Sequence, residues 1–478
     1  MTPDFPDTFL LVLANILLFF AHASSSKSDL RVGYRVTLAV PTTYSPGFTG
    51  RAYLLESDKT EPSFRAALSV EAFEPARKYS CSVEVFAGDV KVWNSGHYSR
   101  FHVSDVCVLE LTADGDLQLK GPNDKIGWRT GTSRQSVERM QILRTGNLVL
   151  ADALNNIKWQ SFNFPTDVML WGQRLDVATW LTSFPRNSTF FYSFEIQHDK
   201  IALYLNSGQF KYSYWDFAPS KNRNITFLQL GTRGLELFDY PHKKIAQILP
   251  SRKPKTEAPR FLALNNESGN MGLYYYSPED RRFSADFQAL NKTCDLPTAC
   301  RPYGICTFSN ACSCIRLGSG SHNGPGSGCE NGLSVDPCSG GGPFEMLELD
   351  GVSDVLQGGP KRANISKDEC TRSCLENCTC LAALYDSRNM GTSECYFYGI
   401  MVGIKQVDRG RGLAYMVKVP KGTRSGHGKS NPKKWVLVLV GVVDGIIILA
   451  VLGGLFYYLI WKRRKRSSDM GTPPTDNR

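Results

Sequence analysis

Residues 146–167 read GNLVLADALNNIKWQSFNFPTD, and the first five of them set the pattern for much of the chain. A glycine that can take positive φ is followed by residues whose side chains alternate between two faces, which is the pattern of a hairpin strand. The pattern also occurs at 114–119, DGDLQL, and less closely at 208–212 and 234–237. Recurrence of one such unit predicts short sheets packed about pseudo-symmetric axes, so we expect residues 30–290 to be mainly β.

The segments GNLVL and WQSFNFPTD, read together, resemble the end of a bulb-type lectin domain of plant S-locus glycoproteins and S-domain receptor-like kinases. In that family the pattern is GNLVL…WQSF-x-x-PTD, and the resemblance implies a modular extracellular region. The implied modules are a β-prism bulb-lectin-like domain over 30–175, a second, lectin-like S-locus region over 176–290, an EGF-like module over 291–332 and a PAN (apple) domain over 338–418.

The sugar motif of bulb-type lectins, Gln-x-Asp-x-Asn-x-Val-x-Tyr, is mostly replaced in this chain. Aligned on the asparagine of GNLVL, the chain has Leu143, Thr145, Asn147, Val149 and Ala151; around the earlier repeat it has Thr112, Asp114, Asp116, Gln118 and Lys120. Sugar hydroxyls left without polar partners cost more than apolar contact returns. We therefore expect Asn147 and Asp114 to serve turns, and we expect no mannose binding at these two motifs.

The fourteen cysteines indicate an oxidising compartment. Cys81 and Cys107 are the only cysteines before residue 290, so a disulfide between them is expected. The next six follow a C-x5-C-x5-C-x5-C-x-C-x14-C pattern that resembles an EGF-like module, although six cysteines alone leave the pairing open. The resemblance implies the pairs Cys294–Cys306, Cys300–Cys312 and Cys314–Cys329. Disulfides must stabilise so short a segment because it has little apolar material; a calcium site is the minority alternative.

A capping box, Ser366-Lys367-Asp368-Glu369-Cys370, predicts the start of a helix. Cys370, Cys374 and Cys378 follow at i, i+4 and i+8, so we expect all three on one helix face. Residues 375–382, LENCTCLA, resemble the PAN signature of S-locus proteins. The resemblance implies the pairs Cys370–Cys395 and Cys374–Cys380 and leaves Cys338 and Cys378 as a third pair. A zinc site is the alternative, and an extracellular location disfavours it.

Residues 435–461 are apolar except for Asp444 and are long enough to cross a bilayer as a helix. The basic cluster KRRKR that follows marks the cytoplasmic side, and an apolar run before Ser24 predicts a signal peptide over 1–23. We therefore expect a single-pass type I protein of the plasma membrane. Its juxtamembrane linker would be 419–434 and its cytoplasmic tail 462–478.

A carboxyl group inside the predicted span is costly unless it has a partner or is protonated. Asp444 lies in GVVDG, where Gly441 and Gly445 form a small-xxx-small pair that permits close helix approach. Our hypothesis is that Gly441, Asp444 and Gly445 contact another membrane helix. The alternative is a tolerated, protonated aspartate beside a chance glycine pair.

Six Asn-x-Ser/Thr sites lie on the predicted outer side and indicate a glycosylated surface: Asn187, Asn224, Asn266, Asn291, Asn364 and Asn377. Two have competing explanations, because Ser366 also caps a helix and Cys378 is the middle residue of the last site. The net charge of +10 is concentrated in the basic cluster and the linker. This distribution indicates contact with a membrane surface and argues against a nucleic-acid partner.

The sequence contains no HExxH motif, no GxSxG motif and no pair of acidic residues that would indicate catalysis. We therefore expect no enzyme, no cofactor and no metal site. The chain also lacks the Gly-rich loop, HRD and DFG motifs of the kinase-bearing relatives. The sequence thus predicts a plant receptor-like protein or co-receptor that binds an extracellular protein, peptide or carbohydrate and acts through a membrane partner such as a receptor-like kinase. The rivals are a glycan-binding lectin sensor that uses another surface, and a non-signalling decoy or adhesion protein.

Overall fold

A computed structural model describes most of residues 29–421 and one later helix. The described residues are 29–41, 43, 47–57, 61–73, 78–183, 190–219, 223–249, 260–315, 337–339, 343–388, 392–408, 412–421 and 448–462. The chain divides into two compact units, residues 1–317 with 321–421 and residues 318–320 with 422–478. Everything described below, except the helix over 448–462, belongs to the first unit.

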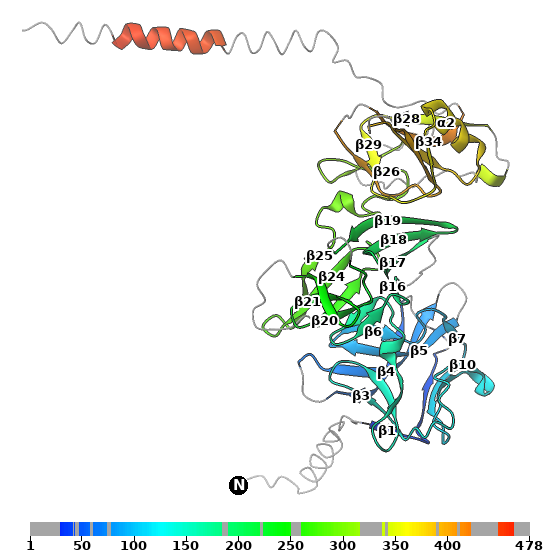
Figure 1. Ribbon diagram of the computed structural model, residues 1–478. Helices are drawn as coiled ribbons and strands as arrows, with labels where there is room; N and C mark the ends of the chain where they lie inside the picture. Colours follow the sequence, from blue (N-terminus) through cyan, green and yellow to red (C-terminus); the bar gives the residue numbers. More distant parts are fainter. Residues whose placement is uncertain are drawn as a thin grey trace, which may run out of the picture. The chain divides into compact units, whose positions relative to one another are not determined.

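The first domain is built from three antiparallel sheets with the strand orders β1-β11-β12-β13, β2-β8-β9-β10 and β3-β4-β5-β6, and β7 pairs with β5 (Figure 1). Its strands are β1 (Asp29–Arg31), β2 (Arg35–Ala39), β3 (Thr49–Glu56), β4 (Phe64–Phe73), β5 (Lys78–Ala87), β6 (Val90–Asn94), β7 (Phe101–Val103), β8 (Val106–Leu111), β9 (Leu117–Lys120), β10 (Ile126–Arg129), β11 (Arg139–Ile142), β12 (Leu148–Ala151) and β13 (Ile157–Gln160). Short 3-10 turns, η1 (Pro122–Asp124) and η2 (Ser161–Asn163), follow β9 and β13.

The glycines of the two sequence repeats occupy the turns that were expected. Gly115 and Gly146 have φ of +90° and +82°, a region that other residues rarely adopt. Neither position has room for a side chain. A Cβ atom would lie 2.9 Å from a carbon of Val137 at Gly115 and 2.6 Å from the ring of Phe64 at Gly146. The hairpin interpretation of both repeats is confirmed.

The second domain repeats the architecture with the sheet orders β14-β23-β24-β25, β15-β20-β21-β22 and β16-β17-β18-β19. Its strands are β14 (Val168–Leu170), β15 (Arg174–Asp176), β16 (Trp180–Thr182), β17 (Phe190–Ile196), β18 (Ile201–Ser207), β19 (Phe210–Phe217), β20 (Phe227–Gly231), β21 (Gly234–Asp239), β22 (Lys243–Ile248), β23 (Phe261–Leu264), β24 (Met271–Ser277) and β25 (Arg282–Gln288). The predicted second lectin-like region is therefore mainly β, as expected.

The boundary expected between residues 175 and 176 falls inside β15, a strand of the second domain, and the preceding strand β14 contributes to both domains. β14 pairs with β23 of the second domain, yet its alternating side chains enter two cores. Val168 and Leu170 pack in the core of the first domain, whereas Met169 packs in that of the second. Period-2 alternation allows one short strand to serve both cores, so no clean cut exists here.

The segments predicted to be an EGF-like module (291–332) and a PAN domain (338–418), called here the EGF-like and PAN segments, share one sheet. One sheet combines β26 (Gly304–Cys306) and β27 (Cys312–Cys314) with β29 (Val352–Asp354) and β33 (Ile404–Gln406), and β26 pairs with β33 in parallel. The second sheet has the order β28-β34-β31-β32-β30. Its strands are β28 (Phe344–Leu349), β30 (Lys361–Ala363), β31 (Ala382–Asp386), β32 (Glu394–Tyr398) and β34 (Leu413–Pro420), and the 3-10 turns η3 (Thr293–Asp295) and η4 (Pro337–Ser339) lie in this part of the chain.

Helix α2 (Lys367–Glu376) starts at the predicted cap, where the side chain of Ser366 accepts from the backbone N–H of Glu369 at 3.2 Å. Cys370 and Cys374 are its buried residues, as the i, i+4 spacing predicts. The expectation that Cys378 continues this face is wrong. The backbone turns to extended geometry at Asn377, so Cys378 lies beyond the helix and bonds to Cys338.

Six disulfides join cysteines in the expected pairs. Cys81–Cys107 was expected because no other cysteine precedes residue 290, Cys338–Cys378 was the pair left over, and the resemblance implied Cys294–Cys306, Cys300–Cys312, Cys370–Cys395 and Cys374–Cys380. The expected partner of Cys314, Cys329, lies outside the described residues. These bonded cysteines are not available to zinc.

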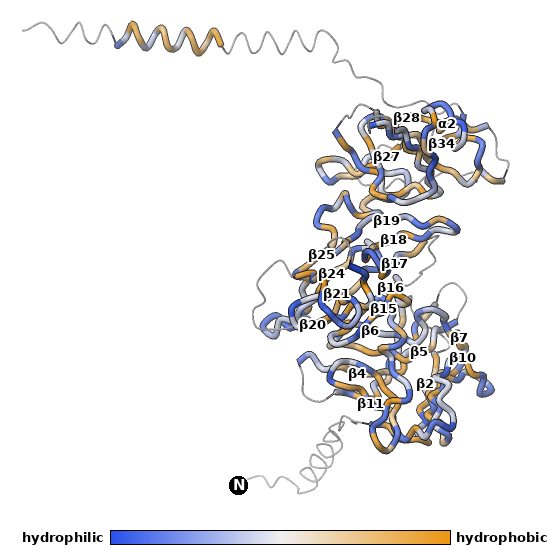
Figure 2. Tube along the Cα trace, in the orientation of Figure 1, coloured by the Kyte–Doolittle hydropathy of each residue, from blue (hydrophilic) through white to orange (hydrophobic). Residues whose placement is uncertain are grey.

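The predicted membrane segment is only partly described. Residues 448–462 form a helix that is mostly apolar (Figure 2). No helix within the described ranges is both long and apolar enough to span a bilayer. Gly441, Asp444 and Gly445 fall outside the described residues, as do the predicted signal peptide and most of the linker and tail.

A row of buried tyrosines joins the second domain to the PAN segment. The ring of Tyr212 on β19 stacks on that of Tyr398, with centroids 5.8 Å apart, and the ring of Tyr398 lies 6.0 Å from that of Tyr415. The hydroxyl of Tyr212 accepts from the backbone N–H of Gly399 at 2.8 Å. At the end of the row, the hydroxyl of Tyr415 donates to the buried carboxyl of Asp354 at 2.9 Å. This shared core explains why both segments lie in one compact unit.

Burial raises the pKa of Asp354 to about 7, although bonds from the Leu356 N–H and the Tyr415 hydroxyl and the charge of Lys405 oppose the rise. In an unfolded chain this pKa is about 3.9. The folded form therefore binds an extra proton between about pH 4 and pH 7, and its stability falls as the pH rises through that window.

We predict that Asp354→Asn removes this fall in stability, which amounts to about 4 kcal/mol at most. The thermal midpoint of the wild-type chain should drop from pH 5 to pH 8 by more than that of the variant, as measured by scanning calorimetry. An equal drop in both proteins would contradict this account of Asp354.

Candidate ligand-binding site

Three tryptophans occupy matching positions in the three sheets of the first domain and so align the sheets with one another. Each stands on the fourth strand of its sheet, opposite a residue of the third strand: Trp93 opposite Val85, Trp128 opposite Leu119 and Trp159 opposite Leu150. Their rings meet edge to face, with centroids 5.9 to 6.4 Å apart. Val85, Leu119 and Leu150 are therefore equivalent positions in a threefold repeat.

The residues directly before and after each of these positions, together with every second residue upstream, give three copies of the row that carries the sugar motif in bulb-type lectins. The copies are Lys78, Ser80, Ser82, Glu84 and Phe86 on β5; Thr112, Asp114, Asp116, Gln118 and Lys120 at β9; and Leu143, Thr145, Asn147, Val149 and Ala151 at β12. The last two rows agree with the alignment made from sequence. The first was missed because it keeps none of the motif's residues, and only the spacing of Trp93 could have revealed it.

In the row at β9, the carboxylate of Asp116 accepts hydrogen bonds from groups inside the domain. Asp116 is fully buried, and its Oδ1 accepts from the backbone N–H groups of Gly131 at 2.7 Å and Thr132 at 3.1 Å. Gln118 Nε2 donates to the other oxygen at 2.9 Å. Asp114 stands on the exposed turn and accepts from Thr112. The pKa of Asp114 is lowered, chiefly by this bond, as a turn-forming carboxylate requires.

In the row at β12, the side chain of Asn147 likewise forms hydrogen bonds within the domain. Asn147 Oδ1 accepts from Ser161 Oγ at 3.2 Å and from the backbone N–H of Phe162 at 3.3 Å. Its Nδ2 donates to Gln160 Oε1 at 2.8 Å. These bonds tie the segment WQSF to GNLVL, which accounts for the pairing of the two motifs in the sequence. Neither Asn147 nor Asp116 has a side-chain oxygen left over for a ligand.

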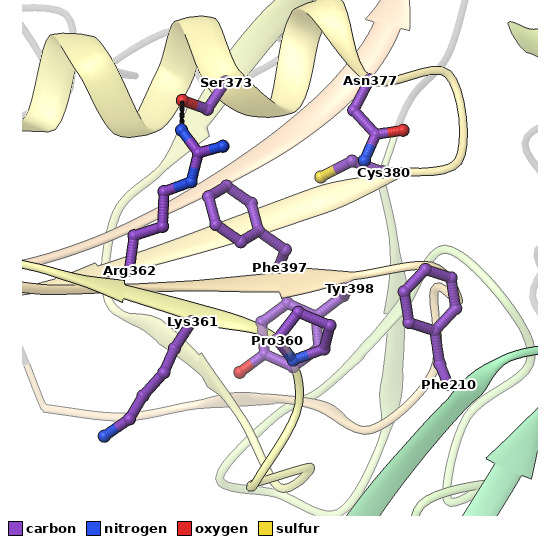
Figure 3. A pocket seen from close by; sticks show the side chains of 9 residues that line it. All are labelled: Phe210, Pro360, Lys361, Arg362, Ser373, Asn377, Cys380, Phe397 and Tyr398. Atoms are coloured by element: carbon purple, nitrogen blue, oxygen red, sulfur yellow. Dashed lines mark hydrogen bonds between the residues drawn. The ribbon is translucent and has the colours of Figure 1, made fainter.

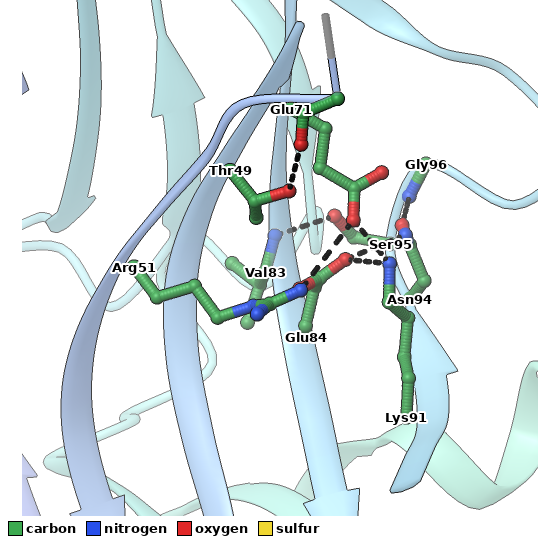
Figure 4. Close-up of polar contacts among 10 residues, drawn as sticks. Thr49, Arg51, Glu71, Val83, Glu84, Lys91, Asn94, Ser95 and Gly96 are labelled. Atoms are coloured by element: carbon green, nitrogen blue, oxygen red, sulfur yellow. Dashed lines mark hydrogen bonds and ion pairs between the residues drawn. The ribbon is translucent and has the colours of Figure 1, made fainter. Parts of the chain in front are cut away.

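The row on β5 carries a charged network instead (Figure 4). Glu84 is fully buried, and its carboxylate meets Lys91 Nζ at 2.5 Å, Asn94 Nδ2 at 3.1 Å and Arg51 Nε at 3.5 Å. Glu71 lies beyond them, 2.6 Å from Lys91 and 3.7 Å from Arg51. Two acids and two bases thus form a network with no net charge.

The network lies on the face of the β3-β4-β5-β6 sheet that points away from the core. Strand register places Arg51 and Tyr53 of β3, Glu71 of β4 and Glu84 of β5 on this face, because alternate residues share a side. The intervening residues Leu68, Val70, Val83 and Val85 pack in the core. We call this surface the β3–β6 face. Lys120 of the β9 row also forms an ion pair, with Glu110 at 3.0 Å, but among the three rows of the described domain only the β5 row has a fully buried acid paired with a cation.

The rim of the β3–β6 face is open to solvent. The side chains of Arg51, Glu71 and Lys91 are each about one-third exposed (33%, 34% and 32%), and Tyr53 is 51% exposed. Among the described residues, the buried hydroxyl of Ser69 on this face has no hydrogen-bond partner. Burial lowers the pKa of Lys91, but Glu84 and Glu71 outweigh burial and leave this pKa raised. Lys91 is therefore a fixed cation.

Five of the six predicted glycosylation sites lie in the described part of the chain, and all five asparagines are exposed: Asn224, Asn266, Asn291, Asn364 and Asn377. Asn266 Nδ2 donates to Asp167 Oδ2 at 2.8 Å. Asn187 falls outside the described residues. Modification of these sites stays a prediction. Within the described ranges, no group of three His, Cys, Asp or Glu residues is arranged to hold a metal ion.

Comparison with known proteins supports the resemblance. Residues 92–184 match the family model of D-mannose binding lectins. A G-type lectin S-receptor-like serine/threonine-protein kinase of Arabidopsis thaliana is 24% identical over 78% of this chain and 46% of its own length. A PAN domain-containing protein of the same plant is 25% identical over 76% of this chain and 74% of its own length.

The chain thus spans about half the length of the receptor-like kinase that it matches. A solved mannose-binding lectin from Gastrodia elata is 21% identical, covers 28% of this chain and 96% of that lectin, and gives a TM-score of 0.17. Residues 92–184 thus match a lectin family, and the chain is similar to plant G-type lectin S-receptor-like proteins, as the sequence indicated.

We predict that Lys91→Met destabilises the first domain by about 3–5 kcal/mol, because it leaves the buried carboxylate of Glu84 without its closest cation. The double variant Lys91→Met/Glu84→Leu should recover most of this loss, since an apolar pair replaces the ion pair. Urea unfolding of the three proteins, followed by circular dichroism, measures both effects. A double variant no more stable than the single one would show that Glu84 and Lys91 are not a coupled pair.

Proposed function

We propose that this chain is a non-catalytic receptor-like protein of the plant cell surface that binds a neutral carbohydrate on the β3–β6 face. The observation that carries the proposal is the half-open network around Glu84. Sugar hydroxyls donate and accept hydrogen bonds, and the rim offers donors from Arg51 and Lys91 beside an acceptor from Glu71. The network is neutral overall, which suits an uncharged ligand.

The exposed ring of Tyr53 supports the same proposal. Carbohydrate and other ligand sites combine aromatic surface with a few fixed polar groups. Arg65 lies over this ring, with its guanidinium carbon 4.3 Å from the centroid, and so holds the ring on the β3–β6 face. The lectin-family match and the receptor-like relatives support a carbohydrate-binding receptor-like role in general. The particular face is our proposal.

We predict that Glu71→Gln weakens binding of a neutral oligosaccharide about tenfold, because a charged acceptor becomes a weaker one while the side-chain volume is kept. The matched control is Asp114→Asn, the same chemical change on an exposed turn, which should leave binding unchanged. Calorimetric titration of the full-length chain with neutral oligosaccharides, mannose-containing ones included, measures the affinities. Loss of affinity in Asp114→Asn alone, or no loss of affinity in either variant, would contradict the proposal.

We further propose that the protein is a single-pass plasma-membrane protein that acts through a membrane partner. The apolar segment 435–461, its basic flank and the kinase-bearing relatives support this proposal. Asp444 with Gly441 and Gly445 would form the contact.

Affinity purification of tagged full-length chain from plant membranes, wild type beside Asp444→Leu, tests the partner proposal. We expect a receptor-like kinase to co-purify with the wild type and to be lost from the variant. Recovery by both proteins would move the contact to the extracellular region. Recovery by neither would favour a decoy or adhesion protein that forms no signalling complex.

A further inference from the structure

A cavity that differs chemically from the β3–β6 face lies where the PAN segment meets the second domain (Figure 3). Its volume is about 240 Å³. Pro360, Lys361 and Arg362 border it at β30, Phe397 and Tyr398 at β32, and Ser373 and Asn377 at α2. Phe210 of β19 is the contribution of the second domain. Small-molecule sites usually measure about 300–1,000 Å³, so this cavity suits one ring or one side chain.

One side of the cavity is aromatic and rigid. The ring of Phe210 stacks on that of Tyr212 at 6.0 Å, and the ring of Tyr212 stacks on that of Tyr398 at 5.8 Å. These rings belong to the tyrosine row that joins the two segments. The aromatic wall is therefore fixed by the buried core and does not need a ligand to order it.

The opposite side offers hydrogen-bond donors. The Arg362 guanidinium donates one bond, to Ser373 Oγ at 3.1 Å, and forms no ion pair within the described residues. The side-chain oxygen of Asn377 already accepts from the backbone N–H and the hydroxyl of Thr379, at 3.0 and 2.9 Å. Its amide nitrogen is the group left for a ligand, and Figure 3 shows it directed toward Cys380 on the cavity wall.

The electrostatics of the cavity favour an anion. Among the described residues that line it, none is acidic and two are basic. Lys361 is bound to Glu394 at 2.7 Å, which leaves Arg362 as the cation without an acidic partner in the described part of the chain. The carboxyl end of α2 would oppose an anion because of its partial negative charge. The buried Lys418 offsets it, since its Nζ donates to the backbone oxygen of Asn377 at 2.7 Å.

We propose that this cavity binds a carboxylate-bearing sugar ring, that is, one uronic acid unit of an acidic polysaccharide. The ring lies against Phe210 and Phe397, and the carboxylate accepts from Arg362 and from the amide of Asn377. The site is separate from the β3–β6 face and differs from it in charge, so it goes beyond the neutral-carbohydrate proposal. It requires Asn377 to be unmodified, because a glycan there would fill the rim.

The test is titration of the full-length chain with a short oligogalacturonate and, as the uncharged match, with its methyl ester. We expect the oligogalacturonate to bind and the ester to bind at least about tenfold more weakly, with affinity falling as salt rises. Arg362→Gln should weaken oligogalacturonate binding about tenfold or more. Arg129→Gln, which removes the same charge from an exposed site on β10, should not.

Four outcomes overturn the inference. They are equal binding of acid and ester, equal losses in Arg362→Gln and Arg129→Gln, Arg362-dependent binding of polyglutamate as tight as that of the oligogalacturonate, and a glycan on Asn377 in peptide mass spectrometry of the same sample. The third outcome would assign the cavity to acidic peptides. Glu71→Gln leaves oligogalacturonate binding intact, which separates this site from the β3–β6 face.

Discussion

The mutual contact of Trp93, Trp128 and Trp159 is the constraint on which the first domain depends. Each indole belongs to a different sheet, and each stands opposite a buried residue of the neighbouring strand. A one-residue slip in any sheet would remove its indole from the cluster and turn its core residues outward. The cluster therefore fixes the register of three sheets at once. It also decides which side chains appear together on each outer face.

That register explains how one repeated framework carries three different surfaces. In two rows, the side chains of Asp116 and Asn147 form hydrogen bonds with segments that follow them in the chain. The third keeps a buried acid, Glu84, whose partners reach the solvent. Only such a half-open network can exchange part of its hydrogen bonding with a ligand while the rest holds its geometry. The basic cavity at the tyrosine row differs because its cation, Arg362, has no acidic partner among the residues that the structure describes.

The sequence predicted what depends on local chemistry. Positive-φ glycines, the cap at Ser366 and the pairing of GNLVL with WQSF all concern residues that are close along the chain. It could not show that β14 serves two cores, that α2 ends before Cys378, or that β26 and β33 share a sheet, because these features arise from long-range packing. The Glu84 network was hidden for a different reason. Its row has none of the motif's residues, and its members come from four strands whose register had to be known first.

The most direct test of the account is hydrogen–deuterium exchange of the full-length chain with and without a neutral oligosaccharide at saturating concentration. Binding at the β3–β6 face should slow exchange in residues 49–56, 64–73 and 78–94 and leave the strands at 106–129 and 139–160 unchanged. Protection confined to those later strands would place the carbohydrate on a row that we assign to structure and would contradict the account, as would the absence of protection anywhere in the first domain.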